Sequence, residues 1–555
     1  MVYSSLIIIV MVLLIGMAVS VFILMWSDKR GQYRNVKAGA YVIFDEDEPV
    51  GQPQDQTFAT VPPPGGDGGG VPRRSAFGPS TYPEPPPGWR SDVDRSVKWP
   101  VLAYVGSAVF WLLVGSIFAL LASFKFNFPD WLVEDAWLTF GRLRPAHLQT
   151  VIFGWLSMVG IGVGTWLWCR LLKTPLRNGG LMLVGCVLWN VGMVIGTIGL
   201  LAGFARSIEW VEFPVVAYLI IIAGFLLNNV ALFRTLARRR VQHLYVSIWY
   251  IGASLLWTPI LLVTFLLPVY SGVPHATANW WFAHNILGLW LTPAALAAAY
   301  YFIPKVTGRP VYSYHLSIIG FWTLALFYNW AGAHHLVGGP PPQWVVTTGI
   351  VFSVMMIIPV VVVALNHHMT IVGRFRRVMA SPTLRFVVFG AMSYTSVSIQ
   401  GSLQSLRSWQ EVTHFTHYTI AHSHLGVYAF ATMIMFGALY YILPRLTGWE
   451  WRSSKLIAAH FWLVGMGIGA YVVALTVGGV IQGLAMLNPN VPFLTMVEST
   501  KLWLLIRSVS GTLMTIGHII FAYLVFENIR KGGPQRDAPT LFPLARRQPA
   551  ATSSK

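Results

Sequence analysis

The stretch AHSHLGVYAFATMIMFGALYYILP, residues 421–444, decides the fold class of this chain. It contains no Lys, Arg, Asp or Glu, and it is long enough for a helix to cross the roughly 30 Å of hydrocarbon in a bilayer. A helix satisfies its backbone hydrogen bonds internally, whereas an isolated strand in lipid does not. The stretch is therefore expected to be a transmembrane helix. Its two imidazoles, from His422 and His424, are expected to face the protein interior.

Comparable apolar runs occur on both sides of this stretch. The chain of 555 residues is 55% hydrophobic and 10% charged, which excludes an ordinary soluble protein of this size. The sequence predicts an all-α polytopic membrane protein with a twelve-helix core and one N-terminal transmembrane helix at 4–26. The twelve core runs lie near 101–123, 148–169, 180–204, 214–233, 245–268, 280–303, 316–338, 345–365, 386–404, 422–443, 457–482 and 503–526.

The basic residues predict the orientation of these helices. Most of the 38 Lys and Arg residues fall in segment 27–100, in every second connection after it and in the C-terminal tail. Connections rich in Lys and Arg are usually cytoplasmic, so the N-terminus is expected outside and the C-terminus in the cytoplasm. The same bias accounts for the net charge of +18 without a nucleic-acid partner. Arg507 lies within the last run, and the outer connections hold Lys125, Arg142, Arg144, Arg206, Arg407 and Lys501.

Composition divides the chain into four parts. Residues 1–50 are expected to be a single-span anchor, and 51–98 a cytoplasmic linker, because PPPGGDGGG and PEPPP cannot build a core. Residues 99–530 form the predicted helical core, and 531–555 a basic cytoplasmic tail. The chain has two cysteines and no CxxCH motif, so it attaches no c-type haem itself.

Six of the fifteen histidines are expected at one membrane depth. His422 and His424 are two residues apart, about 200° around a helix, so they point to nearly opposite faces and can serve two metal centres. His334 and His335 end the run at 316–338, and His284 lies near the start of another run. Three neutral imidazoles make a plausible copper site. His147, which precedes the run at 148–169, falls at the same outer level.

A second adjacent pair, His367 and His368, lies at the opposite, cytoplasmic end of its run. Adjacent histidines alone are weak evidence for a metal site. We expect this pair to lie at the membrane interface and not to bind a metal.

Several motifs, in order, resemble the catalytic subunit of cbb3-type cytochrome c oxidases, members of the haem–copper oxygen reductase superfamily. The resemblance covers about residues 100–530. It implies reduction of O2 to water, coupled to proton uptake and pumping, with electrons from cytochrome c through membrane-anchored c-type cytochrome subunits in a bacterial cytoplasmic membrane. The motifs are WWFAHNILGLWLT (280–292), YYFIPKVTGRPVYSYHLSIIGFW (300–322), YNWAGAHH (328–335), THFTHYTIAHSHLG (413–426), HFWLVGMGIGAYVV (460–473) and IRSVSGTLM (506–514).

The resemblance also implies roles for individual residues. His147 and His424 would be the axial ligands of a low-spin haem b, and His422 the proximal ligand of a high-spin haem b. His284, His334 and His335 would hold the copper. Tyr328 would be the active-site tyrosine, cross-linked in the family to the histidine that matches His284. Glu209 and Glu212 match acidic residues near the haem propionates. One of these two acids contacts a calcium ion in the family.

Two interpretations of polar residues stay open at this point. Arg507 either pairs with a haem propionate or extends its guanidinium to the interface. Tyr314, Ser317 and Tyr328 share one helical stripe at spacings of 3 and 11, which suits a proton path to which Tyr300 or Tyr301 could add. Alternatively, these hydroxyls only satisfy helix contacts.

Two other functions compete with this interpretation. A nitric oxide reductase has the same fold, but members of that class usually carry a glutamate one turn after the first metal histidine, where this chain has Gly288 and also carries Tyr328. A twelve-helix transporter needs no cluster of six histidines.

The N-terminal GAYVIFDEDEP, residues 39–49 with Ala38 before it, resembles a small assembly protein encoded with these oxidases. Segment 1–50 therefore either acts in cofactor insertion or is an inert anchor.

Overall fold

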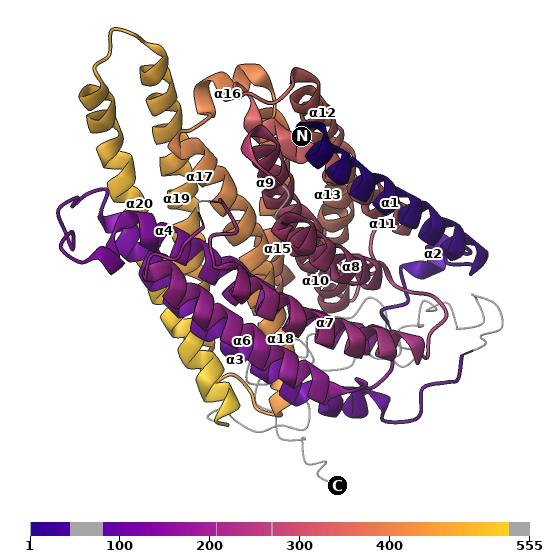
Figure 1. The fold of residues 1–555 in the computed structure, drawn as a ribbon. Helices are drawn as coiled ribbons and strands as arrows, with labels where there is room; N and C mark the ends of the chain where they lie inside the picture. The colour runs from indigo at the N-terminus through magenta and orange to yellow at the C-terminus, as the bar shows by residue number, and fades with distance from the viewer. Residues whose placement is uncertain (1, 45–81, 207, 268–269, 532–555) are drawn as a thin grey trace.

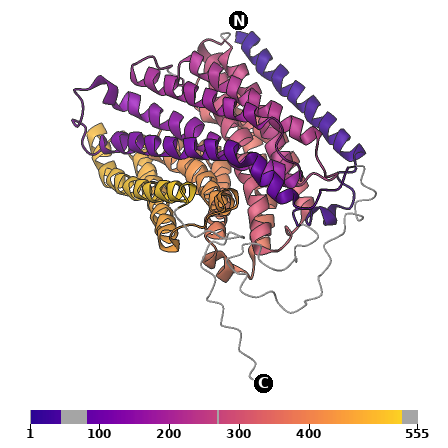
Figure 2. The same ribbon diagram turned by 90° about the horizontal axis from the view of Figure 1, so that it is seen from below.

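The computed structural model describes residues 2–44, 82–206, 208–267 and 270–531. The described chain is helical and forms one bundle (Figures 1 and 2). All twelve predicted core runs are confirmed as helices, several of them in two parts. The core helices are α3 (Trp89–Phe124), α4 (Phe140–Gln149) with α5 (Ser157–Leu171), α6 (Gly179–Leu201), α7 (Val215–Ala237), α8 (Val246–Leu266), α9 (Gly272–Ile286) with α10 (Thr292–Thr307), α11 (Tyr314–Ala331), α12 (Gln343–Met355) with α13 (Ile357–Ile371), α15 (Pro382–Gln404), α17 (His417–His424) with α18 (Met433–Thr447), α19 (Ser454–Leu487) and α20 (Phe493–Ile529).

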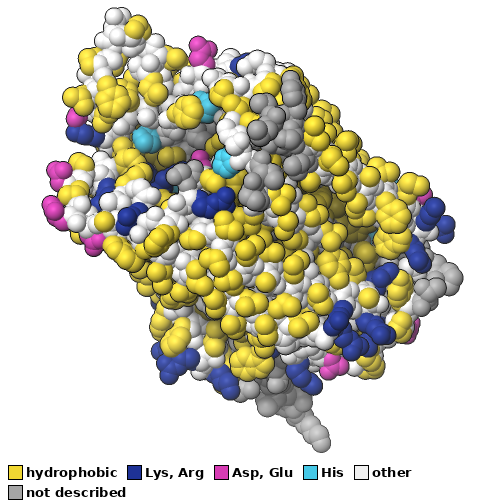
Figure 3. All heavy atoms as spheres, in the orientation of Figure 1, with side chains coloured by type: hydrophobic (Ala, Val, Ile, Leu, Met, Phe, Trp, Pro, Cys, Tyr) yellow, Lys and Arg dark blue, Asp and Glu magenta, His cyan; other side chains and the backbone are white. Residues whose placement is uncertain are grey.

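Hydrophobic side chains form a broad outer surface, with Lys and Arg along its lower edge (Figure 3). Within the described residues, twelve helices are long and apolar enough to cross a membrane, and they include the N-terminal helix α1 (Val2–Lys29). The core helix that falls short of this criterion is α15, whose sequence AMSYTSVSIQ (391–400) is rich in hydroxyls. Such a helix is stable in a membrane where neighbouring helices, here α13 and α18, cover its polar groups.

Three helices that carry predicted ligands contain a π-helical segment just after the histidine. These segments are 150–156 after His147, 287–291 after His284 and 425–432 after His424. A π turn adds a residue and shifts the register of side chains on either side of it, and such turns are frequent at functional sites. Each histidine therefore points in a direction that differs from the one it would have if the helix continued without the π turn.

Two expectations need correction. The linker was expected to reach residue 98, but α3 begins at Trp89. The Pro-rich composition ends at Pro87. The residues after it belong to the membrane helix, because Val93 and Val97 are buried against the core. Residues 45–81 of the linker and 532–555 of the tail lie outside the described residues.

The second correction concerns His367, which was expected at the interface. Only 1% of it is exposed, and its ring lies 4.6 Å from that of Tyr300. Its neighbour His368, by contrast, is partly exposed and contacts Thr395 at 3.4 Å. Two adjacent residues of a helix point about 100° apart. His367 therefore faces the protein interior, whereas His368 does not.

Candidate functional site

All six predicted ligand histidines line a single large cavity in the bundle. The cavity wall is mostly apolar, and it also includes Tyr328, Arg507, Arg144 and Glu209. Figure 3 shows a hollow on this side of the molecule in which histidine side chains are visible. We call this end of the bundle the histidine end. A water-poor, apolar cavity strengthens the electrostatic interactions of the few polar groups within it.

His284, His334 and His335 form a potential metal site. One nitrogen of each ring can be chosen so that all three lie within 4.8 Å of one another. The His284 ring is 5.1 Å from that of His334 and 5.7 Å from that of His335. His284 Nδ1 is buried without a hydrogen-bond partner among the described residues. An all-imidazole set with an unpartnered buried nitrogen fits a copper ion.

Neighbouring groups hold these rings in place. His334 Nδ1 lies 2.7 Å from the hydroxyl of Ser353, and Gln410 donates to the His334 carbonyl at 2.8 Å. His335 stacks on Trp280, with ring centroids 4.2 Å apart. At Gly332, an added Cβ would lie 2.6 Å from the Trp280 carbonyl oxygen, so only glycine lets the two segments approach this closely. Such partners orient a metal ligand and set its tautomer.

Tyr328 lies directly beside the potential metal site. Its ring stacks on that of His284 at 4.5 Å. An added Cβ at Gly288 would lie 1.8 Å from Cε1 and Cζ of Tyr328. The tyrosine ring therefore fills the space that a side chain at position 288 would need. A glutamate at 288 and Tyr328 in its present position exclude each other.

His147 and His424 face each other across the cavity. Their rings are 6.3 Å apart and nearly parallel, at 12°. A metal ion with bonds of about 2 Å to each imidazole fits between such rings. His147 Nδ1 donates to the Gly115 carbonyl and His424 Nδ1 to the Ile420 carbonyl, both at 2.9 Å. A carbonyl oxygen can only accept, so Nε2 is the nitrogen of each ring that could bind a metal; in His424 it lies 3.4 Å from the Tyr471 hydroxyl.

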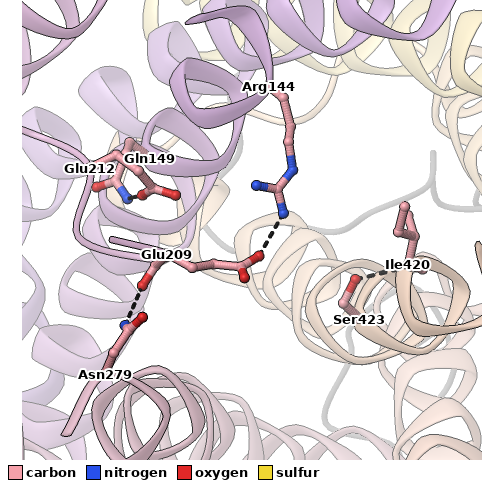
Figure 4. Close-up of polar contacts among 7 residues, drawn as sticks. All are labelled: Arg144, Gln149, Glu209, Glu212, Asn279, Ile420 and Ser423. Atoms are coloured by element: carbon pink, nitrogen blue, oxygen red, sulfur yellow. Dashed lines mark hydrogen bonds and ion pairs between the residues drawn. The ribbon is translucent and has the colours of Figure 1, made fainter. Parts of the chain in front are cut away.

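His422 points away from this pair, as the two-residue spacing predicts. Its Nδ1 lies 3.1 Å from Oε1 of Gln400, and an added Cβ at Gly401 would lie 3.1 Å from its ring. Ser423, between the two histidines, donates to the Ile420 carbonyl at 3.0 Å (Figure 4). One helix thus presents histidines to two parts of the cavity.

Arg507 lies against the cavity, over the ring of Phe126 at 4.8 Å. Its Nε and Nη1 are buried and have no hydrogen-bond partner within the described chain. Buried donors of a charged group without partners are costly, so these two nitrogens suit an anionic group in the cavity.

Glu209 and Glu212 point in different directions (Figure 4). Glu209 is partly exposed and forms an ion pair with Arg144 at 2.6 Å, and its backbone carbonyl accepts from Asn279 at 2.8 Å. Glu212 is 5% exposed and accepts from the amide of Gln149, which in turn accepts from the Tyr218 hydroxyl at 2.5 Å. The family resemblance matched both acids to the propionate region, but the loop points them in different directions.

Burial raises the pKa of the Glu212 carboxyl from 4.5 to about 7. The folded protein therefore holds this proton more tightly than the unfolded chain, and Glu212 lowers stability as the pH rises from about 4.5 to about 7. We expect the thermal stability of the calcium-free protein in detergent to fall across this window by on the order of 3 kcal/mol from this group. Glu212→Gln should remove that part of the slope. An unchanged slope in Glu212→Gln would contradict the assignment.

A chain of polar groups runs from Ser317 toward the end of the bundle opposite the histidines. Asn366 donates to the Ser317 hydroxyl at 3.0 Å and to the Tyr300 hydroxyl at 3.4 Å. Tyr314 donates to the Leu244 carbonyl at 3.3 Å. Ser317 lies eleven residues before Tyr328 on α11, about 16 Å along the axis.

The structure brings Tyr300, and not Tyr301, to this chain. The Tyr301 ring packs 5.7 Å from Trp166, on the other side of α10, because consecutive helical residues cannot share a face. Sequence reasoning missed Asn366, Gln400, Ser353 and Gln410. For Asn366 the available signal was a lone amide at the end of the apolar run VVVALN (361–366).

Comparisons with known proteins show the family to which this chain is related. Residues 99–513 match the family model described as cytochrome c and quinol oxidase polypeptide I. The chain is 31% identical over 443 residues to a cbb3-type cytochrome c oxidase subunit of Stutzerimonas stutzeri, covering 77% of this chain and 94% of that protein. It is 32% identical over 447 residues to a cytochrome c oxidase subunit 1 homologue of Azorhizobium caulinodans, covering 76% and 80%.

Two further similarities are weaker. A nitric oxide reductase chain of Stutzerimonas stutzeri is 24% identical over 165 residues, which is 28% of this chain and 35% of that protein. A solved haem–copper terminal oxidase dimer superposes with a TM-score of 0.64 over 80% of this chain and 86% of that one, at 18% identity. At that identity the second similarity supports the fold alone.

Proposed function

Because the chain belongs to the cytochrome c and quinol oxidase polypeptide I family and is a cbb3-type member of it, we infer that it is the catalytic subunit of a respiratory terminal oxidase that reduces O2 to water. The observation that carries this conclusion is the three-histidine cluster with Tyr328 stacked on His284. The tyrosine ring occupies the space beside Gly288 in which a nitric oxide reductase would place its glutamate. O2 is therefore favoured over NO as the substrate.

We propose the roles that the family resemblance implies for the site residues, and their positions in the cavity support them. His284, His334 and His335 would hold copper, and His422 would hold the iron of a high-spin haem b on the other side of the same cavity. When bound, the haem and the copper would supply the electrons for O2 reduction. His147 and His424, whose rings are nearly parallel and 6.3 Å apart, would hold a low-spin haem b. This second haem would supply electron transfer.

Tyr328 is the proposed proton donor at the reaction site. Its ring is held against His284, within reach of a molecule bound beside the copper ligands. A phenol can release a proton and an electron, and both are needed to cleave O2 without releasing a partly reduced product. Protons would reach it through Tyr314, Tyr300, Asn366 and Ser317, with water molecules bridging the remaining gap to Tyr328.

Finer features of the assembly are also proposals. Arg507 would pair with a haem propionate, and Glu209 or Glu212 would lie near the propionates and bind calcium. The chain is a multi-pass membrane protein; we propose that it lies in a bacterial cytoplasmic membrane, with the histidine end and the N-terminus outside. It would receive electrons from cytochrome c through membrane-anchored c-type cytochrome subunits.

The experiment that tests the function is metal and haem analysis of the purified complex, with O2 and NO consumption measured side by side. We expect haem b, copper and cyanide-sensitive O2 uptake. Iron in place of copper, with uptake of NO only, would reverse the conclusion. Haem content without reductase activity on either gas would leave an assembly role instead.

Replacing Arg507 with leucine is expected to shift the midpoint potential of the low-spin haem negatively, because a positive charge near a propionate favours the reduced state. The potential is measured by redox titration of the haem b absorbance. Arg452→Leu is the matched control, because Arg452 pairs with Glu527 outside the cavity. Equal potentials in both variants would show that Arg507 does not contact the haem.

A further inference from the structure

Residues 27–44, which comprise the end of α1 and the segment after it, are far more buried than the rest of that helix. On α1, Ile7, Met11 and Phe22 are 54%, 55% and 69% exposed. In the segment 27–44, Ile43 and Phe44 are 4% and 3% exposed. Figure 1 shows α1 along the edge of the bundle, and α2 (Val36–Gly39) contacts α11. An inert anchor needs no contacts beyond its membrane helix, so the burial of 27–44 points to a function for this segment.

Gln32 binds the backbone of the loop before α8. Its Nε2 donates to the Gln242 carbonyl at 2.8 Å, and its Oε1 accepts from the Leu244 amide at 2.8 Å. Gln32 is 2% exposed. The Leu244 carbonyl in turn accepts the Tyr314 hydroxyl at 3.3 Å. One side chain of the N-terminal segment thus holds the loop that orients Tyr314.

Gly39 lies directly against Tyr314. A Cβ added at Gly39 would be 2.7 Å from Cδ1 and 2.8 Å from Cε1 of the Tyr314 ring, and 3.1 Å from Nε2 of His243. Only a residue without a side chain permits this approach. The backbone of 27–44 therefore covers Tyr314, which is 4% exposed.

Two further contacts attach the segment to the helices around Tyr314. Lys305, at the end of α10, donates to the Ile43 carbonyl at 2.9 Å and lies over the Phe44 ring. Tyr33 accepts from the indole of Trp322 at 3.0 Å, and its ring lies 5.6 Å from that of Trp249. The segment therefore contacts α8, α10 and α11 together, all at the end opposite the histidines.

We propose that residues 27–44 form a built-in cap over the entrance of the proton path, in which Gln32 and Gly39 are positioning residues for Tyr314. This inference rests on the proposed proton path. The cap is a permanent part of the working enzyme, and it holds the Tyr314 ring between Gly39 and the Leu244 carbonyl. Displacing it lets the tyrosine ring turn and slows proton delivery, while the haem and copper sites, about 30 Å away along α11, stay intact.

The test uses the full-length enzyme purified with its partner subunits. Gly39→Val and Gln32→Leu are expected to slow O2 turnover roughly tenfold, because displacement of a proton-transfer group by about 1 Å is costly. Haem content, copper content and the KM for O2 should not change. The loss should grow with rising pH and the solvent isotope effect should increase. Gly16→Val is the matched control, since a Cβ there meets nothing within 4 Å.

A double variant separates this inference from the proton path itself. Adding Gly39→Val to Tyr314→Phe should cause no further loss. If Tyr314→Phe turns over at the wild-type rate, the proton path is wrong. If Tyr314→Phe is slow but Gly39→Val and Gln32→Leu are both normal, only the cap is wrong. Loss of haem or copper with normal turnover per haem would also overturn the cap and favour an assembly role.

Discussion

Replacing His334 with alanine is expected to eliminate copper from the purified enzyme and to abolish O2 reduction. One nitrogen from each of the three imidazoles lies within 4.8 Å of the others, and two ligands hold a copper ion far less tightly than three. Loss of an outer partner of a metal ligand costs roughly 10–100-fold in metal affinity or activity, and loss of the ligand itself should exceed that. Copper is measured by elemental analysis, haem by optical spectroscopy and turnover by O2 uptake.

His460→Ala is the control for this prediction. His460 is also fully buried, but it contacts Tyr440 and Phe386 away from the cavity. We expect this variant to lose stability and to keep its copper-to-haem ratio. Ser353→Ala should give an intermediate result, because it removes only the partner of His334 Nδ1. Full copper occupancy in His334→Ala would rule out the proposed ligand set.

Gly288→Ala is expected to lower O2 turnover by roughly 100-fold, although it adds a single methyl group. That methyl group would lie 1.8 Å from the Tyr328 ring, far inside van der Waals contact. Tyr328 must therefore leave its position on His284. The haem at the low-spin site should be unaffected, since His147 and His424 belong to other helices.

The matched control is Gly160→Ala, in α5. Gly160 is also buried in a membrane helix, but its added Cβ would meet its nearest neighbour, the Cβ of Ala294, at an ordinary 3.7 Å. This variant should keep its turnover. If Gly288→Ala retained wild-type turnover with full metal content, the position of Tyr328 would not matter for the reaction.

The sequence by itself determined the helices and the level of the histidines. Apolar runs of about 20 residues predict membrane helices without knowledge of their neighbours, because lipid forces each backbone to satisfy its own hydrogen bonds. The spacing of His422 and His424 predicted that they diverge, since this follows from the geometry of one helix. The assignment of these residues to haem and copper came from the family resemblance and stays a prediction.

Only the tertiary structure decided which of several neighbouring residues face the site. Sequence spacing did not separate Tyr300 from Tyr301 or Glu209 from Glu212, because the choice depends on how helices far apart in the chain pack together. It also did not reveal that Tyr328 fills the space beside Gly288, or that Gly39 lies against Tyr314. Such close approaches join segments tens to hundreds of residues apart, and local periodicity contains no information about them.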